Sequence, residues 1–436
     1  MSALAAFAAE HGAVVCGSDR NYDREPDHKI FRMLRSKGIF IAPQDGSGLD
    51  LSFDLVVFST AVEPDNPEVL RAAELGLKTV LRPDFLAGII NGFDSIAVAG
   101  TNGKSTTAGM LAFMMRELGM VPNYIGGGRV KQFQTQSNPG NSLSGDSGLL
   151  VAEACESDGS IVRYHPAITI ISNLSLDHNR IDETKTMFST LAENTRRLVI
   201  VNADDTNLEA ILPHAALTYG IDKKADVRAC DIVMRGFFSR FRIEGLVFEI
   251  KLPGRHNLYN ALAALAVLRS LGVPLSELVR PLYNFRGIDR RFDIYLDEGG
   301  FFVVDDYAHN PQKIAALMQT VSAEKHKICY IFQPHGFGPT RLLRDGYVDT
   351  FSSFLRKEDQ LFILPIYYAG GDVSREISSE DLAAPLRSAG YSVDLLKSRR
   401  DLNVRLEEWN TFIVFGARDE SLSDFAQNIA ERLKLT

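Results

Sequence analysis

Residues 95–117, SIAVAGTNGKSTTAGMLAFMMRE, join a short apolar segment to a helical segment through a loop with two glycines. The apolar run before the loop is typical of a strand that is buried on both faces of a parallel sheet. Glycines let backbone N–H groups converge, the start of a helix attracts anions, Lys104 can meet terminal phosphates, and the Ser105 hydroxyl can bind Mg²⁺. The stretch therefore predicts a phosphate-binding loop for a nucleoside triphosphate, with ATP preferred.

The loop departs from the strict pattern at one position. Glycine is expected at position 98, and this chain has Val98. A plain glycine-rich turn is the alternative, which the GKST cluster at a helix start disfavours. We interpret the loop as a variant form of a phosphate cradle.

Short apolar strands alternate with helical patterns on both sides of this loop, a rhythm that predicts an α/β protein with doubly wound, parallel-rich sheets. The predicted strands cover 13–16, 55–59, 95–99, 148–153, 168–173, 198–202, 301–305, 327–332, 360–364 and 412–415. The predicted helices cover 66–75, 104–117, 257–271, 311–321 and 421–433.

Length and composition limit the possible classes of protein. The 436 residues favour about three domains at roughly 150 residues each. A net charge of −8 argues against a nucleic-acid surface or a polybasic membrane patch. No apolar run approaches the ~18 residues of a membrane span, the first residues lack a basic signal-peptide region, and the four cysteines lie far apart. We expect a cytoplasmic protein with no nucleic-acid or membrane partner.

Two breaks in the strand–helix rhythm predict domain boundaries. One is the Pro- and Gly-marked stretch 82–94, and the other is FRGIDRRF at 285–292. The predicted domains are 1–92, 93–287 and 288–436. The polar segment 129–147 is interpreted as a mobile surface loop.

Several motifs, in order along nearly the whole chain, resemble the Mur ligase superfamily, which also includes folylpolyglutamate synthases. Besides GTNGKSTT, they are STAVEPDNPEV (59–69), EACESDGS (153–160), SNLSLDHN (172–179), LPGRHNLYNALAA (252–264), RRF (290–292), DDYAHNP (305–311) and FQPHGFGPTR (332–341). The DNPE, ESD and QPH segments favour the branch that acts on UDP-N-acetylmuramate over the folate branch.

The resemblance implies an ATP- and Mg²⁺-dependent amide ligase of peptidoglycan precursor synthesis. It would join an amino acid, L-alanine favoured, to the lactyl carboxylate of UDP-N-acetylmuramate through an acyl phosphate. The implied fold has a Rossmann-like UDP-sugar domain, a central phosphate-loop ATPase domain and a C-terminal Rossmann-like acceptor domain. A monomer or weak dimer is expected.

Site residues are carried over from the matching motifs. The resemblance assigns ATP to Gly100, Thr101, Asn102, Gly103, Lys104, Ser105, Thr106, Asn257, Asn260, Arg290 and Asp306, and metal ions to Ser105, Glu153 and His178. It assigns catalysis to Lys104, Glu153, His178, Arg290 and His309, and substrates to Ser59, Thr60, Asn66, Glu156, Ser157, Tyr307 and His335.

Simpler roles stay open for some of these residues. Asn257 can cap a helix, and whichever of Arg290 and Arg291 points away from ATP can form a structural salt bridge. His309 can cap a helix instead of guiding the amine. Cys155 is interpreted as a buried small residue with no nucleophilic role.

Two departures from the family pattern bear on substrates. The chain begins within the motif that follows the family's first strand and glycine-rich diphosphate loop, so the N-terminal domain is predicted to lack its first strand unless the true start lies upstream. Gly126 to Gly128 are further candidates for the UDP-sugar. Gly336 and Pro339 stand where relatives carry arginines that clamp the acceptor's carboxylate, and Asn310 stands where the alanine-adding enzymes carry His. Arg341 is an alternative clamp.

Two other functions therefore stay open. One is a ligase that attaches murein tripeptide to UDP-N-acetylmuramate in cell-wall recycling. The other is a non-catalytic nucleotide-binding protein of the same family.

Overall fold

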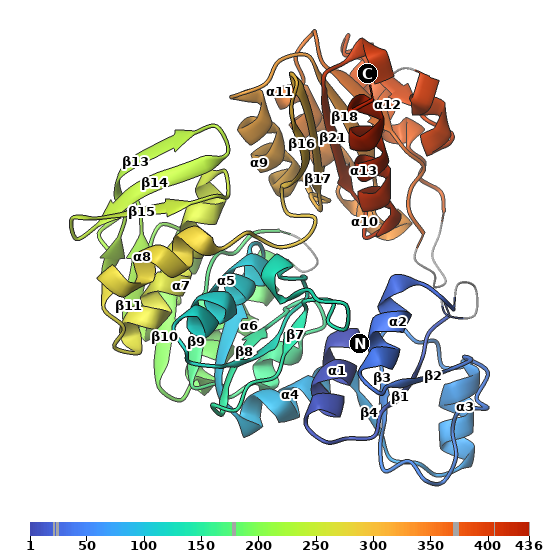
Figure 1. Ribbon diagram of the computed structural model, residues 1–436, viewed down its shortest axis with the longest axis vertical. Coiled ribbons are helices and arrows are strands. Elements are labelled where there is room, and N and C mark those ends of the chain that lie inside the picture. The colour runs from blue at the N-terminus through green and yellow to red at the C-terminus, as the bar shows by residue number, and fades with distance from the viewer. Residues whose placement is uncertain (21, 23–25, 177–179, 369–374, 405, 436) are drawn as a thin grey trace. The chain divides into compact units, whose positions relative to one another are not determined.

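The computed structural model describes residues 1–20, 22, 26–176, 180–368, 375–404 and 406–435. It contains two compact units, Met1–Ile288 and Asp289–Thr436 (Figure 1). Both are α/β with mostly parallel sheets, so the predicted fold class is confirmed. Among the helices of these residues, none has the length and apolar character to cross a membrane.

An eight-stranded sheet forms the centre of the first unit. Neighbouring strands pair in parallel except for the last pair, which is antiparallel. The central strands are buried on both faces, as continuous apolar runs require. In spatial order they are β12 (Val227–Arg228), β11 (Leu217–Gly220), β10 (Leu198–Asn202), β9 (Ile168–Ile171), β5 (Asp94–Ala99), β8 (Leu149–Glu153), β6 (Asn123–Ile125) and β7 (Ser142–Leu143).

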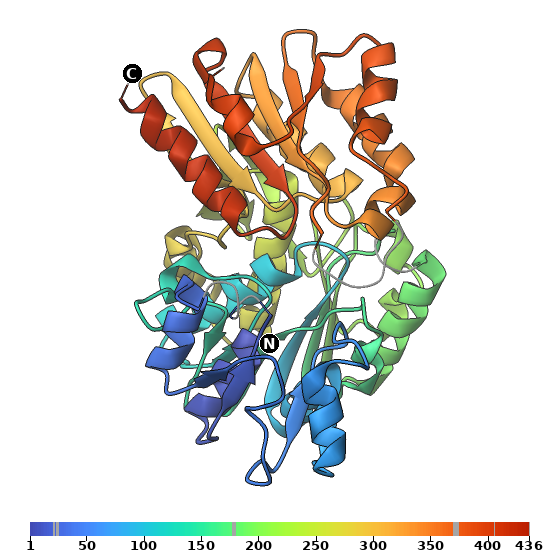
Figure 2. The same cartoon turned by 90° about the vertical axis from the view of Figure 1, so that its right-hand side faces the viewer.

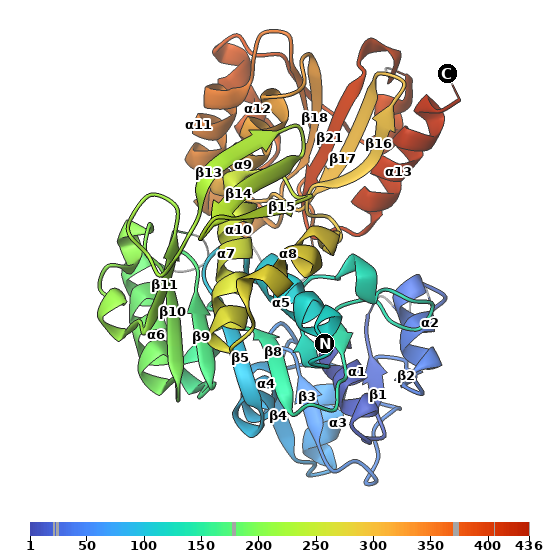
Figure 3. The same ribbon diagram turned by 60° about the vertical axis from the view of Figure 1, so that its left-hand side comes forward.

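Helices cover both faces of this sheet. Alternate side chains of β5 point to opposite faces, so Ile96 and Val98 join one apolar cluster while Ala97 and Ala99 join the other. The first cluster includes α5 (Lys104–Glu117), α7 (Arg255–Ser270) and α8 (Leu275–Asn284). The second includes α1 (Ser2–Glu10), α4 (Arg82–Gly92) and α6 (Ile181–Asn194). Figure 3 shows α5, α7 and α8 on one side of the sheet.

A three-stranded antiparallel sheet, which the sequence analysis did not predict, packs against α8. Its strands are β13 (Cys230–Arg235), β14 (Phe238–Ile243) and β15 (Leu246–Ile250). Phe241 and Phe248 stack with ring centroids 5.6 Å apart inside the first apolar cluster. Glu244 and Gly245, at φ 50° and 82°, form the two-residue turn between β14 and β15.

The N-terminal part contains two separate parallel strand pairs. One joins β1 (Cys16–Ser18) to β2 (Phe40–Ala42), and the other joins β3 (Val56–Phe58) to β4 (Thr79–Leu81). Among the described residues, the two pairs form separate sheets. Their carboxyl ends are linked by side chains, because the Ser18 hydroxyl donates to Glu68 and Arg20 forms an ion pair with Glu63 at 2.8 Å. Helices α2 (Lys29–Ser36) and α3 (Pro67–Glu74) complete this part.

The second unit is built on a six-stranded sheet with one antiparallel edge. Its order is β16 (Asp293–Glu298), β17 (Phe301–Asp306), β21 (Thr411–Gly416), β18 (Ile328–Gln333), β19 (Gln360–Ile363) and β20 (Val393–Leu395). Figure 2 shows helices on both faces. One face packs against α13 (Ser421–Leu433). On the other, Phe332 contacts Tyr347 and Phe351 of α11 (Arg344–Phe354). The remaining helices are α9 (Pro311–Ser322), α10 (Phe337–Leu342) and α12 (Glu380–Ser388).

Two segments are more regular or more buried than the sequence analysis expected. The stretch predicted as a Pro- and Gly-marked break forms α4, because Pro83 lies in the first turn, where its missing N–H costs nothing. Segment 129–147 does not lie on the surface throughout. Val130 and Phe133 enter the core at 0% and 2% exposure, and a short 3₁₀ helix forms at Lys131–Phe133.

Candidate active site

The phosphate loop lies between β5 and α5, and two of its positions accept only glycine. Gly100 and Gly103 have φ of 139° and 83°, in the left-handed region that other residues rarely adopt. A Cβ on Gly100 would lie 2.0 Å from Ser172 Oγ, and one on Gly103 would lie 2.3 Å from Asn260 Oδ1. The loop is therefore a cradle whose backbone N–H groups stand at a helix start, which fits a bound phosphate.

The segment after β9 holds this loop in place. The Asn102 N–H donates to Asn173 Oδ1 at 2.8 Å, and Asn173 Nδ2 donates back to the Asn102 carbonyl at 2.8 Å. The Thr101 N–H donates to the Asn173 carbonyl at 3.0 Å, and Ser175 N–H donates to Thr101 Oγ1 at 3.0 Å. This segment leads to His178, which lies outside the described residues.

Lys104, the first residue of α5, is buried among oxygen atoms. Its Nζ donates to Glu156 Oε2 at 2.8 Å and to the carbonyls of Gly100 and Thr101 at 2.6 and 3.2 Å. Burial lowers the pKa of Lys104, but the carboxylates of Glu156 and Glu153 outweigh it, so the pKa is raised overall. The lysine therefore stays charged at neutral pH. Burial also raises the pKa of the Cys155 thiol, which supports the interpretation that Cys155 is not a nucleophile.

Glu153, the last residue of β8, stands over the start of α5. Its Oε2 accepts from the Ser105 hydroxyl at 2.9 Å and from the Gly127 N–H at 2.8 Å. A carboxylate beside a hydroxyl is a ligand pair that suits Mg²⁺. Within the described residues there is no complete group of three His, Cys, Asp or Glu side chains that could hold a metal ion. Ser105 and Glu153 fit as part of a magnesium site that bound phosphates would complete.

Gly127 supports Glu153, whereas the sequence analysis named it only as a candidate for binding the UDP-sugar. A Cβ there would lie 2.8 Å from Glu153 Oε2, so a larger residue would displace the carboxylate. We expect Gly127→Ala to lower Mg²⁺-dependent ATP turnover about 10–100-fold, as loss of support for a metal ligand does. Phosphate release measured against Mg²⁺ concentration checks this.

Gly88→Ala is the matched control, because a Cβ at Gly88 in α4 would meet nothing within 4 Å. It should keep wild-type turnover. Wild-type turnover in Gly127→Ala would show that the contact with Glu153 does not orient this carboxylate.

The two asparagines of α7 connect the phosphate loop to that helix. Asn260 Oδ1 accepts from the Thr107 hydroxyl at 3.1 Å, and its Nδ2 donates to Asn257 Oδ1 at 3.1 Å. Asn257 Nδ2 donates to the Pro253 carbonyl at 2.8 Å. The capping alternative for Asn257 is wrong, because α7 begins at Arg255 after Gly254.

In the second unit, Arg290 forms an internal ion pair. Its Nε lies 3.0 Å from Asp305 Oδ2, and Nη1 donates to the carbonyls of Ala417 and Asp419, both at 3.0 Å. The Asp305 side chain is 0% exposed and that of Arg290 is 12% exposed. Both guanidinium groups lie over the Tyr307 ring, with Cζ 4.8 Å from its centroid for Arg291 and 5.5 Å for Arg290. The structural salt bridge that the sequence left open thus belongs to Arg290.

Asp306, the last residue of β17, has an unusual acidity. Burial raises its pKa to about 6, against opposing effects of Arg291 and of the Phe292 N–H, which donates to Oδ2 at 2.6 Å. The carboxyl group therefore changes charge just below neutral pH, and its ionised form costs stability in the folded protein.

Asp306→Asn should stabilise the second unit in a pH-dependent way. A folded pKa above the unfolded value of 3.8 means that ionisation opposes folding above about pH 6 and has no effect near pH 4. The gain should be full at pH 8, shrink as the pH falls through 6 and vanish near 4. Urea unfolding followed by the fluorescence of Trp409, the single tryptophan, measures it. A gain independent of pH would contradict the assignment.

Three predicted acceptor-site residues lie together beyond the ends of β17 and β18. The ring of His309 lies 4.5 Å from Tyr307 and 6.0 Å from His335, between centroids. The Tyr367 ring, which no motif indicated, stacks 6.0 Å from His335. Burial, with Lys313 nearby, lowers the pKa of His309 well below its usual value, so it is neutral at pH 7. The capping alternative for His309 is wrong, because Asn310 caps α9 through the Lys313 N–H.

Gly336 and Pro339, which stand where relatives carry arginines, lie in a part of the second unit that has other arginines at its surface. Gly336 is at φ 71°, and Pro339 lies inside α10. Arg341 pairs with Glu376 at 3.6 Å, and both side chains are largely exposed. The Arg375 guanidinium lies 4.2 Å above the Tyr368 ring. The structure therefore supplies two exposed arginines near this loop, Arg341 from the motif itself and Arg375 from outside it.

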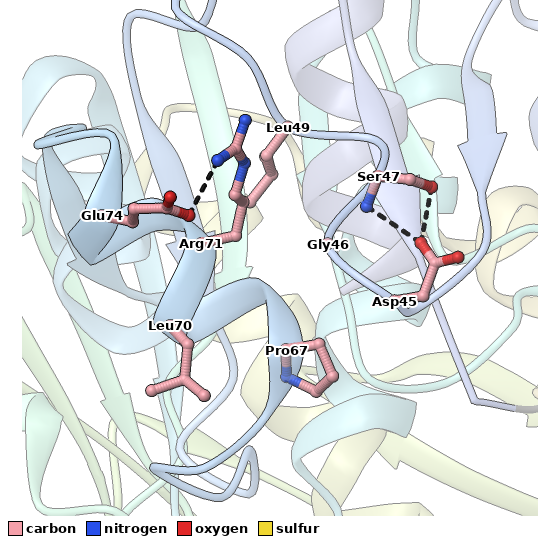
Figure 4. Close-up of a pocket in the computed structure, with 8 residues that line it drawn as sticks. All are labelled: Asp45, Gly46, Ser47, Leu49, Pro67, Leu70, Arg71 and Glu74. Carbon is pink, nitrogen blue, oxygen red and sulfur yellow. Dashed lines mark hydrogen bonds and ion pairs between the residues drawn. The ribbon is translucent and has the colours of Figure 1, made fainter.

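The candidates for the UDP-sugar are spread over several segments. Ser59 and Thr60 follow β3, Ser157 accompanies Glu156 after β8, and Asn66 caps α3 by accepting from the Glu68 N–H at 3.0 Å. A pocket in the N-terminal part lies elsewhere (Figure 4). It is lined by Asp45, Gly46, Ser47, Leu49, Pro67, Leu70, Arg71 and Glu74, none of which is a predicted site residue. Its polar groups pair with one another, as Arg71 does with Glu74.

Comparison with known proteins follows the same division of the chain. Residues 1–94 match the Mur ligase family catalytic domain, 98–268 the Mur ligase middle domain and 290–418 the Mur ligase glutamate ligase domain. The UDP-N-acetylmuramate–L-alanine ligase of Streptomyces coelicolor is 36% identical, covering 90% of this chain and 86% of the relative. That of Persephonella marina is 32% identical over 98% and 95%.

Solved structures agree. The UDP-N-acetylmuramate–alanine ligase of Thermotoga maritima has a TM-score of 0.81 at 26% identity, covering 100% of this chain and 96% of that one. A murein peptide ligase of Psychrobacter arcticus, at 23% identity and a TM-score of 0.72, shares the fold. The resemblance found in the motifs is thus confirmed, and the chain belongs to the Mur ligase family.

Proposed function

We propose that this protein is an ATP-dependent ligase that joins L-alanine to the lactyl carboxylate of UDP-N-acetylmuramate. The observation that carries the proposal is the cluster of Lys104, Ser105 and Glu153 around a glycine cradle at the start of α5. Relatives of similar length that bear this activity in their names support the choice of substrates.

The proposed reaction has two steps, because a carboxylate must be activated before an amine can attack it. It is a poor electrophile, so its oxygen first attacks the γ-phosphorus of ATP, the bond to ADP breaks, and an acyl phosphate forms. The amine of the acceptor then attacks the acyl carbon, loses a proton, and expels phosphate to leave the amide. Phosphoryl transfer needs mainly positioning and charge neutralisation.

Each part of the site would serve one of these needs. Lys104 would bind the terminal phosphates, and Ser105, Glu153 and His178 would hold Mg²⁺, which neutralises the charge of the phosphates. Asn257 and Asn260 would reach the adenine, and Asp306 the ribose. His309, which is neutral at pH 7 and lies beside Tyr307 and His335, would guide the incoming amine.

Domain roles are part of the same proposal. Residues 1–92 would bind the UDP-sugar, 93–287 would bind ATP, and 288–436 would present the acceptor. The cytoplasmic location and the monomeric or weakly dimeric state stay predictions.

One observation favours a second candidate for the acceptor substrate. Gly336 and Pro339 cannot clamp a carboxylate, so a larger acceptor such as the murein tripeptide is the alternative to L-alanine. Incubation with Mg-ATP, UDP-N-acetylmuramate and L-alanine, glycine, L-serine or the tripeptide, followed by mass spectrometry and phosphate release, separates them. A UDP-muramoyl-alanine product supports the proposal, and a tripeptide product alone replaces it. Absence of any amide would favour a non-catalytic role.

A further inference from the structure

The three N–H groups of the Lys104 ammonium all have acceptors within the protein. An ammonium carries three donors, and the Lys104 Nζ has contacts with the Gly100 carbonyl, the Thr101 carbonyl and Glu156 Oε2. The two side chains are buried, with 10% of Lys104 and 3% of Glu156 exposed. A phosphate oxygen can therefore bind Lys104 only if one of these contacts is given up.

Glu156 is the contact that can be exchanged. The two carbonyls belong to the phosphate loop, whose backbone is fixed by Asn173. Glu156 belongs to the separate segment after β8. It is also an anion, as a phosphate is, so one charge-assisted hydrogen bond would replace another of the same kind.

We infer that Glu156 is a positioning residue that holds Lys104 against the phosphate loop and releases it to the phosphates of the nucleotide. The pair is a latch, and nucleotide binding opens it. This inference rests on the proposed function, because it takes ATP as the nucleotide, and it adds a competitor for Lys104 within the same site.

A latch lowers apparent affinity by the fraction of molecules in which it is open. Breaking it should tighten binding of Mg-ATP, by about tenfold if one molecule in ten is open in the wild type. The same change should lower the melting temperature of the protein without nucleotide, because a buried ammonium loses its carboxylate partner. A residue with a merely structural role would lower stability without improving affinity.

Two substitutions separate the latch from simple charge repulsion. Glu156→Gln removes both the charge and the ion pair, whereas Glu156→Asp keeps the charge and shortens the side chain by one methylene, which we expect to break the 2.8 Å contact with Lys104. Calorimetric titration of the full-length protein with Mg-ATP should show tighter binding in both. Tightening in Glu156→Gln alone would mean repulsion and overturn the latch, and if that variant does not fold, Glu156→Asp still decides.

A double-mutant cycle gives the second test. In a Lys104→Ala background Glu156→Gln should improve the affinity for Mg-ATP much less than in the wild type, since there is no lysine to release. Equal improvement in both backgrounds would overturn the inference. The matched control is Asp158→Asn, which removes a carboxylate from the same loop that pairs with Arg82 at 2.7 Å, and its affinity for Mg-ATP should stay within about twofold of wild type.

The same titrations distinguish failure of the proposed function from failure of the latch. Wild-type protein that binds no ATP overturns the proposed function and the latch together. Wild-type protein that binds ATP, with no gain in either Glu156 variant, overturns the latch alone.

Discussion

Lys104→Ala should reduce ATP-dependent amide formation by about a thousandfold or more while the protein stays folded. The ammonium at the start of α5 neutralises charge that moves during phosphoryl transfer, and loss of one such fixed donor costs about 10²–10³ in rate even when it is uncharged. The loss should appear in kcat as well as in the affinity for ATP. Product mass and phosphate release measure it, and circular dichroism confirms folding.

The control for Lys104→Ala is Lys224→Ala, which removes an exposed lysine from the same unit. It changes the net charge equally and should keep wild-type turnover. Activity near wild type in Lys104→Ala would remove Lys104 from the mechanism and, with it, the proposed use of the glycine cradle.

Arg290→Ala should destabilise the second unit by about 3–5 kcal/mol, the range found when one partner of a buried ion pair is removed. Asp305 is fully buried, and without Arg290 its carboxylate would keep the hydrogen bond from Ser423, at 2.6 Å, but lose its cation. The carbonyls of Ala417 and Asp419 would lose a donor as well. Trp409 reports this unit directly, since it packs 5.7 Å from Phe362 beneath the same sheet.

Arg291→Ala is the matched control, because this neighbouring guanidinium lies over the face of Tyr307, and Asp306, the carboxyl group whose pKa it lowers, keeps its hydrogen bond from the Phe292 N–H when Arg291 is removed. Its effect on the urea midpoint should be well below that of Arg290→Ala. Equal effects would mean that the Arg290–Asp305 pair contributes no more than surface packing, and Arg290 would then be free to serve only ATP.

The sequence predicted the elements whose signal is continuous. The strand Leu198–Asn202 and the helices Lys104–Glu117 and Ser421–Leu433 match their predicted bounds. Each has either an unbroken apolar run or a clear helical period. Three-residue strands such as β2, β4 and β20 escaped, because so few residues carry no periodicity. The sheet β13–β15 was not predicted, although the segment FSRFRI alternates between exposed and buried residues. Its two arginines and one serine leave too few apolar residues to show this alternation in the sequence.

The site was predictable where its residues are contiguous and not where distant segments meet. The segment GTNGKST alone predicts a phosphate loop, and the positive φ angles of its two glycines agree with that prediction. That Gly127 holds Glu153, or that Glu156 holds Lys104, depends on segments 26 and 52 residues apart. Which of two adjacent arginines pairs internally depends on Asp305, Ala417 and Asp419, which lie 15, 127 and 129 residues further along the chain.

The sheet β13–β15 bears on the order in which the first unit acquires its structure. Its strands lie within residues 230–250 and are joined by tight turns, so it can form as local hairpins, which takes about 1–10 μs. Strand β5 must instead find β8 and β9, some fifty and seventy residues later in the chain. The phosphate loop follows β5, so we expect it to reach its native conformation only after β5 has paired with β8 and β9. Nucleotide binding should therefore be among the last properties to return on refolding, well after the hairpins have formed.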